Sequence, residues 1–175
     1  YLTLSSMSPP SYFYRSLVVN PGTSVYIDPQ RIYARNLEVP SGGAVANARA
    51  IARAYSVFAT GGRELNLRAE TLELLSAPAR PASRGFYDEC LRGEAQFSLG
   101  FMKPCATWPF GSPRSFGSPG AGGAMGYADP STGVGYGYVT SLMGTSLTGD
   151  PRDVALRDAL DTAIGTARVP GKHAA

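Results

Sequence analysis

A glycine-rich stretch from residue 116 to residue 143 limits what this chain can fold into. It reads FGSPGAGGAMGYADP, then STG, then VGYGYVTSLM, so that small residues alternate with aromatic ones. A period of two predicts two strands, and the turn-forming residues at Asp129–Gly133 predict a tight connection between them. We therefore expect an antiparallel hairpin whose small residues lie on a closely packed side.

The remaining elements are predicted from periodicity and from residues that start or end helices. Ser41-Gly42-Gly43 is expected to open a helix that ends at Gly61-Gly62, and Leu67–Ser76 to form a second one. The apolar positions of the first helix have near-helical spacing: Val45, Ala48, Ile51, Ala52, Tyr55 and Phe58. Gln96–Met102 alternates as a strand, with Phe97, Leu99 and Phe101 predicted on one side. Asp150-Pro151 predicts the start of a last helix, with Asp at the cap and Pro at the first helical position.

Composition excludes several kinds of chemistry from the 175 residues. The single histidine, His173, cannot supply a Ser-His-Asp triad or a His-rich metal site inside the fold. Cys90 and Cys105 do not have the spacing of a zinc knuckle, so we expect no metal. The net charge of +3 is spread among acidic residues, which argues against a nucleic-acid partner. The longest apolar runs are too short for a membrane span.

The glycine cluster from Gly117 to Gly126 has two open interpretations. A dinucleotide fingerprint is excluded because Met125 interrupts the spacing and the block runs into a strand, and the P-loop pattern is absent, so we expect no cofactor. The small residues either serve packing alone or let a ligand approach the backbone closely.

Phe116–Pro130 followed by Val134–Met143 resembles the third motif and the following hairpin of the serine β-lactamase-like family, in its class C and esterase branch. Val39–Gly43, with Asn47–Arg53 and the Gly61-Gly62 stop, is similar to a helical segment of the same family. The resemblance covers roughly residues 35 to 165. It implies an α/β (α+β) fold of the β-lactamase/transpeptidase type, with an antiparallel sheet flanked by helices.

The resemblance also implies a mechanism in which Ser-x-x-Lys supplies the nucleophile, Tyr-x-Asn supplies a proton relay, and a strand forms one wall of the site. Neither side-chain motif occurs here. A Ser-x-x-Lys motif needs a serine three residues before a lysine, but Gly100 and Val169 occupy that position before Lys103 and Lys172. No asparagine has a tyrosine two residues before it.

Both motifs precede the matched region in the family, so we expect this chain to be the C-terminal half of a domain. The expected parts are an irregular wrap or lid (1–40), the C-terminal portion of the domain (41–169) and a tail (170–175). The expected partner is the missing N-terminal half, in the same protein or in a separate chain.

The third motif places the candidate site residues. Gly120 falls at the family's glycine, and Ala121 falls where a backbone N–H completes the oxyanion hole. Ser118 stands where the family has His or Lys, and Ser141 stands near a position where some relatives carry an Asn. As Ser118 lacks a positive charge, the resemblance favours a small neutral ester or amide substrate over a carboxylate-bearing β-lactam. A hydroxyl that satisfies a neighbouring backbone group is the other interpretation of Ser118.

Two functions follow from this resemblance. The chain is either part of a serine hydrolase acting through an acyl-enzyme, with its nucleophile outside these residues, or a catalytically silent module that keeps the fold for structure or assembly. The substitution at Ser118 favours the second, and the retained glycine-rich backbone favours the first.

Overall fold

The computed structural model describes residues 7–20, 23–24, 44–145 and 149–165. The chain divides into two compact units, which we describe separately: Tyr1–Ala46 with Asp88–Arg92, and Asn47–Tyr87 with Gly93–Ala175. The boundaries expected at residues 40 and 169 fall outside the described residues, as does the motif Val39–Gly43. The division into wrap, domain portion and tail therefore stays a prediction.

The first unit contains short local elements: α2 (Tyr12–Leu17), β1 (Val18–Asn20) and β2 (Thr23–Ser24). The hydroxyl oxygen of Ser11 accepts the backbone N–H of Tyr14 at 3.0 Å, which satisfies one of the free donors at the start of α2. β1 and β2 pair antiparallel. Regular structure thus occurs inside the segment that was expected to be irregular.

The second unit carries the larger elements. Its helical segments are α4 (Ala48–Ala59), the 3₁₀ turn η1 (Arg63–Leu65), α5 (Ala69–Ser76) and α6 (Pro151–Ala163). The short strands β3 (Tyr87–Asp88) and β4 (Gly93–Glu94) follow α5 along the chain, and the second residue of β3, Asp88, belongs to the first unit.

Helix caps explain where α4 and α6 begin. The side chain of Asn47 accepts the N–H of Ala50 at 2.9 Å, and α4 starts at the residue after Asn47. The carboxylate of Asp150 accepts the N–H of Arg152 at 3.0 Å, and Pro151 occupies the first turn of α6. The last helix is therefore confirmed with the cap that the sequence predicted.

The start of the first long helix was predicted too early. Residues 44–47 precede α4 without helical structure, and Val45 is 90% exposed instead of lying on an apolar helix face. The physical reason is the cap: Asn47 offers a side-chain acceptor to the first free N–H groups, whereas the preceding Ala44 to Ala46 cannot.

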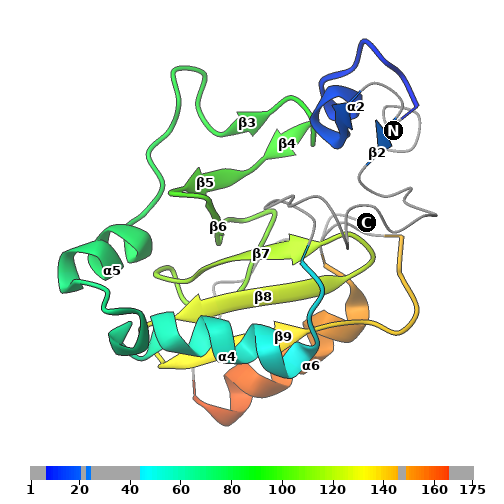
Figure 1. Ribbon diagram of the computed structural model, residues 1–175. Helices are drawn as coiled ribbons and strands as arrows, with labels where there is room; N and C mark the ends of the chain where they lie inside the picture. The colour runs from blue at the N-terminus through cyan, green and yellow to red at the C-terminus, as the bar shows by residue number, and fades with distance from the viewer. Residues whose placement is uncertain (1–6, 21–22, 25–43, 146–148, 166–175) are drawn as a thin grey trace. The chain divides into compact units, whose positions relative to one another are not determined.

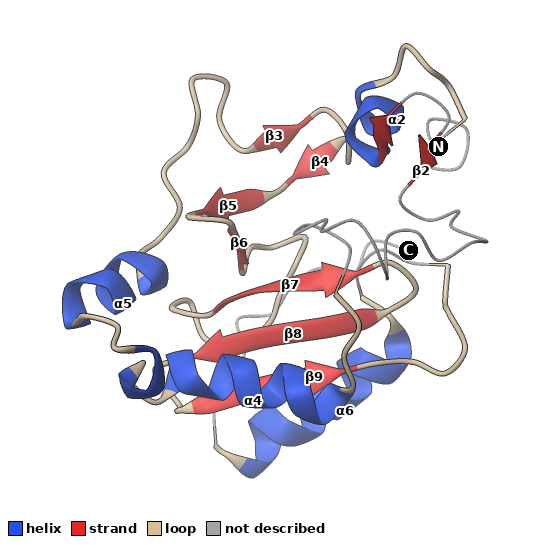
Figure 2. Ribbon diagram, viewed as in Figure 1, coloured by secondary structure: helices blue, strands red, loops and turns tan. Residues whose placement is uncertain are grey.

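A five-stranded antiparallel sheet forms the centre of the second unit (Figure 2). Its order follows the chain: β5 (Gln96–Ser98), β6 (Phe101–Lys103), β7 (Phe116–Gly120), β8 (Ala124–Asp129) and β9 (Val134–Tyr138). β8 and β9 form the predicted hairpin, with Asp129 opposite Val134 across the connection. The antiparallel sheet flanked by helices is confirmed.

The single strand predicted over Gln96–Met102 is wrong, because this segment is a hairpin. Leu99 and Gly100 both have positive φ, at 51° and 86°, which reverses the chain between β5 and β6. Two successive residues with positive φ are typical of the tight turns that match strand twist. Phe97 is consequently 51% exposed and Leu99 61% exposed, and the expected apolar face does not form.

Two hydrophobic cores lie against the sheet. Helix α4 runs along β8 and β9 (Figure 1), and its core is built from buried residues of α4, α5, β7 and β8: Ala59, Leu75, Phe116 and Ala128. The other core contains Phe110, Met125 and Tyr127, with Tyr136 packed against it. Tyr127 and Tyr136 stack with ring centroids 5.0 Å apart, which confirms the packing role predicted for them.

Candidate active site

The edge of β7 is open where the sequence placed the candidate residues. β7 pairs with β8 along its whole length, from Phe116 opposite Ala128 to Gly120 opposite Ala124. Its pairing with β6 is limited to one position, Met102 opposite Gly117. Within the described part of the chain, no strand therefore pairs with Ser118–Gly120 on the β6 side, and the backbone there can receive another group.

The residues after β7 form a tight turn built on glycine. The N–H of Gly123 donates to the carbonyl of Gly120 at 3.1 Å, and Gly122 has a φ of +86°. A positive φ at the third residue of a four-residue turn is typical of a type II turn and favours glycine. Ala121 is the second residue of this turn and is exposed, so its backbone lies at the surface next to the open edge of β7.

The segment that follows β9 is held against this turn. The carbonyl of Gly122 accepts the N–H of Gly144 at 2.8 Å and the hydroxyl of Thr140 at 3.4 Å. Ser141 is exposed between these two contacts. The structure therefore brings the segment of Ser141 to the turn that carries Ala121, from a position twenty residues later in the chain.

Two charged residues at the start of α6 fix the same segment. The guanidinium of Arg152 donates to both carboxylate oxygens of Asp150, at 2.9 and 2.7 Å, and to the carbonyl of Leu142 at 3.0 Å. Hydrogen bonds from Arg152 lower the pKa of Asp150 to about 2, so that this carboxylate stays ionised near neutral pH. A Cβ on Gly123 would lie 2.4 Å from an oxygen of Asp150, so only glycine fits there without displacement.

Ser118 lies on the exposed part of β7. Its hydroxyl donates to the carbonyl of Pro119 at 3.0 Å. This local bond is the kind that the second interpretation of Ser118 describes. Ser118 also lies opposite Gly126 in the register, on the face of the sheet that carries α4.

A polar network that the sequence reasoning missed links β9 and α6 to the loop before β7. Tyr136 donates its hydroxyl to Asp153 at 2.8 Å, and Arg157 donates to Asp153 at 2.8 Å and to the carbonyl of Pro109 at 2.6 Å. Burial and the bond to Asp153 raise the pKa of Tyr136, so it stays a protonated donor. The spacing of four between Asp153 and Arg157 was the available signal, since such pairs meet on one helix face.

The loop before β7 has a second anchor in the hairpin turn. The carboxylate of Asp129 accepts the N–H and the hydroxyl of Ser112, at 2.9 and 2.6 Å, and the N–H of Ser131 at 3.0 Å. Asp129 thus shapes the turn, as predicted, and also ties the loop to it.

The described residues contain no group of three or more His, Cys, Asp and Glu side chains that could hold a metal ion. Among the helices that the structure describes, none is long and apolar enough to cross a membrane. The candidate site is built from three parts: the edge of β7 at Ser118–Gly120, the turn at Gly120–Gly123, and the segment after β9 that hydrogen bonds hold against this turn.

Comparison with known proteins identifies the family. The family model described as Beta-lactamase matches residues 7–161. The chain belongs to the beta-lactamase family. The resemblance seen in the glycine-rich block is therefore confirmed, together with a fold of the β-lactamase/transpeptidase type.

Relatives in this family are named as esterases and penicillin-binding-protein homologues. "Esterase/beta-lactamase LipL" from Mycobacterium tuberculosis (strain ATCC 25618 / H37Rv) is 35% identical over 103 residues, covering 58% of this chain and 23% of that protein. A penicillin-binding protein homologue from Caulobacter crescentus is 29% identical with a TM-score of 0.66, covering 83% of this chain and 41% of the other.

Two further solved structures are also similar. EstA from Arthrobacter nitroguajacolicus Rue61a is 26% identical with a TM-score of 0.59, covering 85% of this chain and 45% of that one. A family VIII carboxylesterase is 30% identical with a TM-score of 0.55, covering 65% of this chain and 31% of that one. The chain thus spans less than half the length of these relatives, and at family level it is serine-hydrolase-like.

Proposed function

We propose that this chain is the C-terminal portion of a serine hydrolase that cleaves an ester or amide through an acyl-enzyme. The open edge of β7 at Ser118–Gly120, continued by the exposed backbone of Ala121, is the observation that carries the proposal. A serine outside this chain attacks the substrate carbonyl carbon, and the alcohol or amine leaves with a proton. Water then hydrolyses the acyl-enzyme and regenerates the serine.

The contribution of this chain is electrostatic and comes from the main chain. The N–H of Ala121 is proposed to donate to the carbonyl oxygen as negative charge develops on it, with Gly120 forming the wall beside it. The turn bond from Gly123 to Gly120 and the bonds from Gly144 and Thr140 to Gly122 fix the backbone before substrate binds. Such preorganisation is what an oxyanion site requires.

The proposed substrate is small and neutral. Ser118 and Ser141 are the proposed substrate-facing side chains, and neither carries a charge. The guanidinium of Arg152 is bonded to Asp150 and to the carbonyl of Leu142. These features favour esters and amides without a carboxylate next to the scissile bond.

The test uses the longest natural protein that contains this chain. We expect a fluorophosphonate probe to label one serine in it and p-nitrophenyl acetate to be hydrolysed. Ala121→Pro removes the N–H and should lower kcat about 100-fold or more, whereas Ala121→Gly keeps the N–H and serves as the matched control. If the folded protein is neither labelled nor active, the catalytically silent structural or assembly module replaces this proposal.

A further inference from the structure

Two large apolar side chains lie exposed beside the glycine turn. Leu142 is 75% exposed and Met143 is 70% exposed. We propose that Leu142 and Met143 form an apolar platform that binds the hydrophobic acyl group of a neutral ester. This inference rests on the proposed function and adds the substrate class: esters with an apolar chain several carbons long.

Met143 is in contact with the turn itself. A Cβ on Gly122 would lie 2.8 to 2.9 Å from the Cβ, Cγ and Cε atoms of Met143, so the Met143 side chain lies across the Cα of Gly122. Ala121, whose N–H is the proposed oxyanion donor, is the residue before Gly122. The thioether chain therefore lies against the residue that follows the proposed oxyanion donor.

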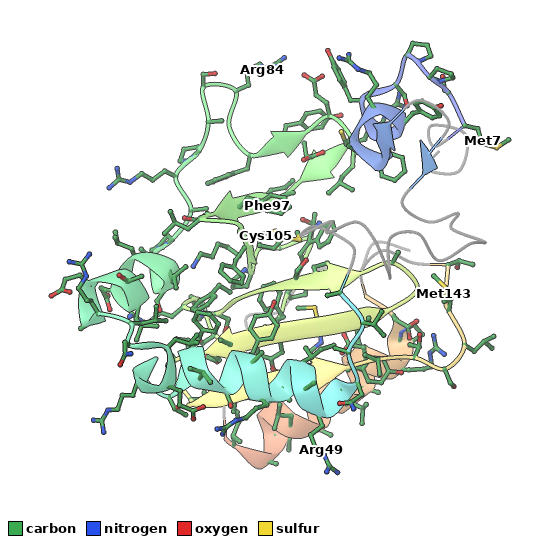
Figure 3. All side chains as sticks on the ribbon, viewed as in Figure 1. Met7, Arg49, Arg84, Phe97, Cys105 and Met143 are labelled. Atoms are coloured by element: carbon green, nitrogen blue, oxygen red, sulfur yellow. The ribbon has the colours of Figure 1, made fainter. Side chains whose placement is uncertain are left out.

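The backbone of the platform is fixed. The carbonyl of Leu142 accepts a hydrogen bond from Arg152 at 3.0 Å, and the N–H of Gly144 donates to Gly122 at 2.8 Å. Figure 3 shows Met143 on the connection after β9, at the end of the sheet where β7 passes into β8. Because Leu142 and Met143 are anchored on both sides, little backbone ordering is needed when a ligand covers them.

The charges at this position agree with an apolar occupant. Ser118 replaces the cation that would attract a carboxylate, and Arg152 is bonded to the ionised Asp150. Removal of apolar surface from water is then the main source of affinity available to a substrate at Leu142 and Met143. Met is also a flexible side chain, suited to chains of different shape.

Chain-length selectivity tests the platform in the full protein. We compare kcat/KM for p-nitrophenyl acetate and p-nitrophenyl octanoate in the wild type, in Met143→Gln and in Leu142→Gln/Met143→Gln. The double variant is expected to lower the octanoate-to-acetate ratio at least fivefold, mainly through a higher KM for octanoate. Leu74→Gln, at a 61% exposed leucine on α5, is the matched control and should leave the ratio unchanged.

The melting temperature of each variant distinguishes substrate binding at Leu142 and Met143 from coverage of these residues by another part of the protein. If the ratio stays constant while the melting temperature falls, another part of the protein covers Leu142 and Met143, and the inference is wrong. It is also wrong if neither quantity changes. A wild-type protein that hydrolyses neither ester and takes up no fluorophosphonate overturns both the proposed function and this inference, whereas an active enzyme with an unchanged ratio overturns the inference alone.

Discussion

The two faces of the sheet differ sharply although the same strands build both. On the α4 face, Gly135 and Gly137 of β9 meet the helix backbone directly: a Cβ on Gly135 would lie 2.2 Å from the N of Ser56, and a Cβ on Gly137 would lie 2.5 Å from the carbonyl of Ala48. On the opposite face, Tyr136 stacks on Tyr127 and donates to Asp153 of α6. Along β9, the α4 face is held by close backbone approach, whereas the opposite face is held by stacked tyrosine rings and a hydrogen bond to a buried ion pair.

The difference shows how one short strand can satisfy two unlike neighbours. Successive residues of a strand point to opposite faces, so alternating Gly and Tyr in β9 gives space to α4 and bulk to α6. At β9, the contact with α4 depends on the absence of side chains, whereas the contact with α6 depends on charge and hydrogen bonding. The predictions below separate these two kinds of stabilisation.

The largest effect is expected at the buried ion pair. Arg157→Ala leaves the carboxylate of Asp153, which is 3% exposed, without its cationic partner and frees the carbonyl of Pro109. We expect a loss of about 4 kcal/mol in the free energy of unfolding. Urea denaturation measures this loss. Replacing both residues, as Asp153→Asn with Arg157→Met, should cost less than Arg157→Ala; an equal or larger cost would show that the charge pair is not the reason.

The second-largest loss of stability is expected where the glycines of β9 meet α4. Gly135→Ala forces the backbone of Ser56 away from β9 and is expected to cost about 3 kcal/mol, at the upper end for overpacking. The melting temperature of the variant reports the change. Gly149→Ala offers a comparison in which a Cβ meets no atom within 4 Å, although its φ of +67° adds backbone strain. If the two variants lose equal stability, close packing is not what requires Gly135.

A smaller effect is expected from the hydroxyl of Tyr136. Tyr136→Phe keeps the ring stacked on Tyr127 and removes one hydrogen bond to a charged acceptor, which is worth about 2 kcal/mol. Denaturation of the variant next to Tyr138→Phe, on the same strand, measures this bond. A loss confined to Tyr136→Phe supports the polar network, and equal losses contradict it.

A further effect concerns pH dependence on the α4 face, where Lys103 is 2% exposed. Lys103 donates to the carbonyl of Leu75 and lies 5.1 Å from the ring centre of Phe116. Burial, and then repulsion by Arg114, lower the pKa of Lys103 to about 8 from an ordinary value of 10.5. Between these values the unfolded chain binds more protons, so stability should rise as pH increases from about 8 to 10.5.

Lys103→Met tests this pH dependence because it removes the titrating group and keeps a long side chain. The free energy of unfolding, measured at intervals from pH 7 to 10.5, should rise less in the variant than in the wild type. Arg53→Ala at an exposed ion pair with Glu64 provides the control and should leave the slope unaltered. A variant with the same slope as the wild type would assign the pH dependence to other groups.

Local pattern was a good guide where the residues and their immediate neighbours decide the outcome. The cap at Asp150, the turn at Asp129 and the packing of Tyr127 all followed from short-range chemistry. The pattern failed at Leu99 and Gly100, because a continuous alternation of apolar residues does not reveal a chain reversal that needs two positive φ angles. It also failed at Val45, where the nearby cap residue outweighed helical spacing.

By itself the sequence determined the alternation of Gly and Tyr in the last strands, the Asp150 cap of the last helix and the family, because these depend on residues that are close along the chain. Only the tertiary structure decided that Arg157 is buried against Pro109, that Lys103 donates to the carbonyl of Leu75 in α5, and that Met143 meets the turn at Gly122. These contacts join residues twenty to fifty positions apart. Their formation depends on how the sheet and helices pack together, and the spacing of apolar and polar residues along the chain does not predict that packing.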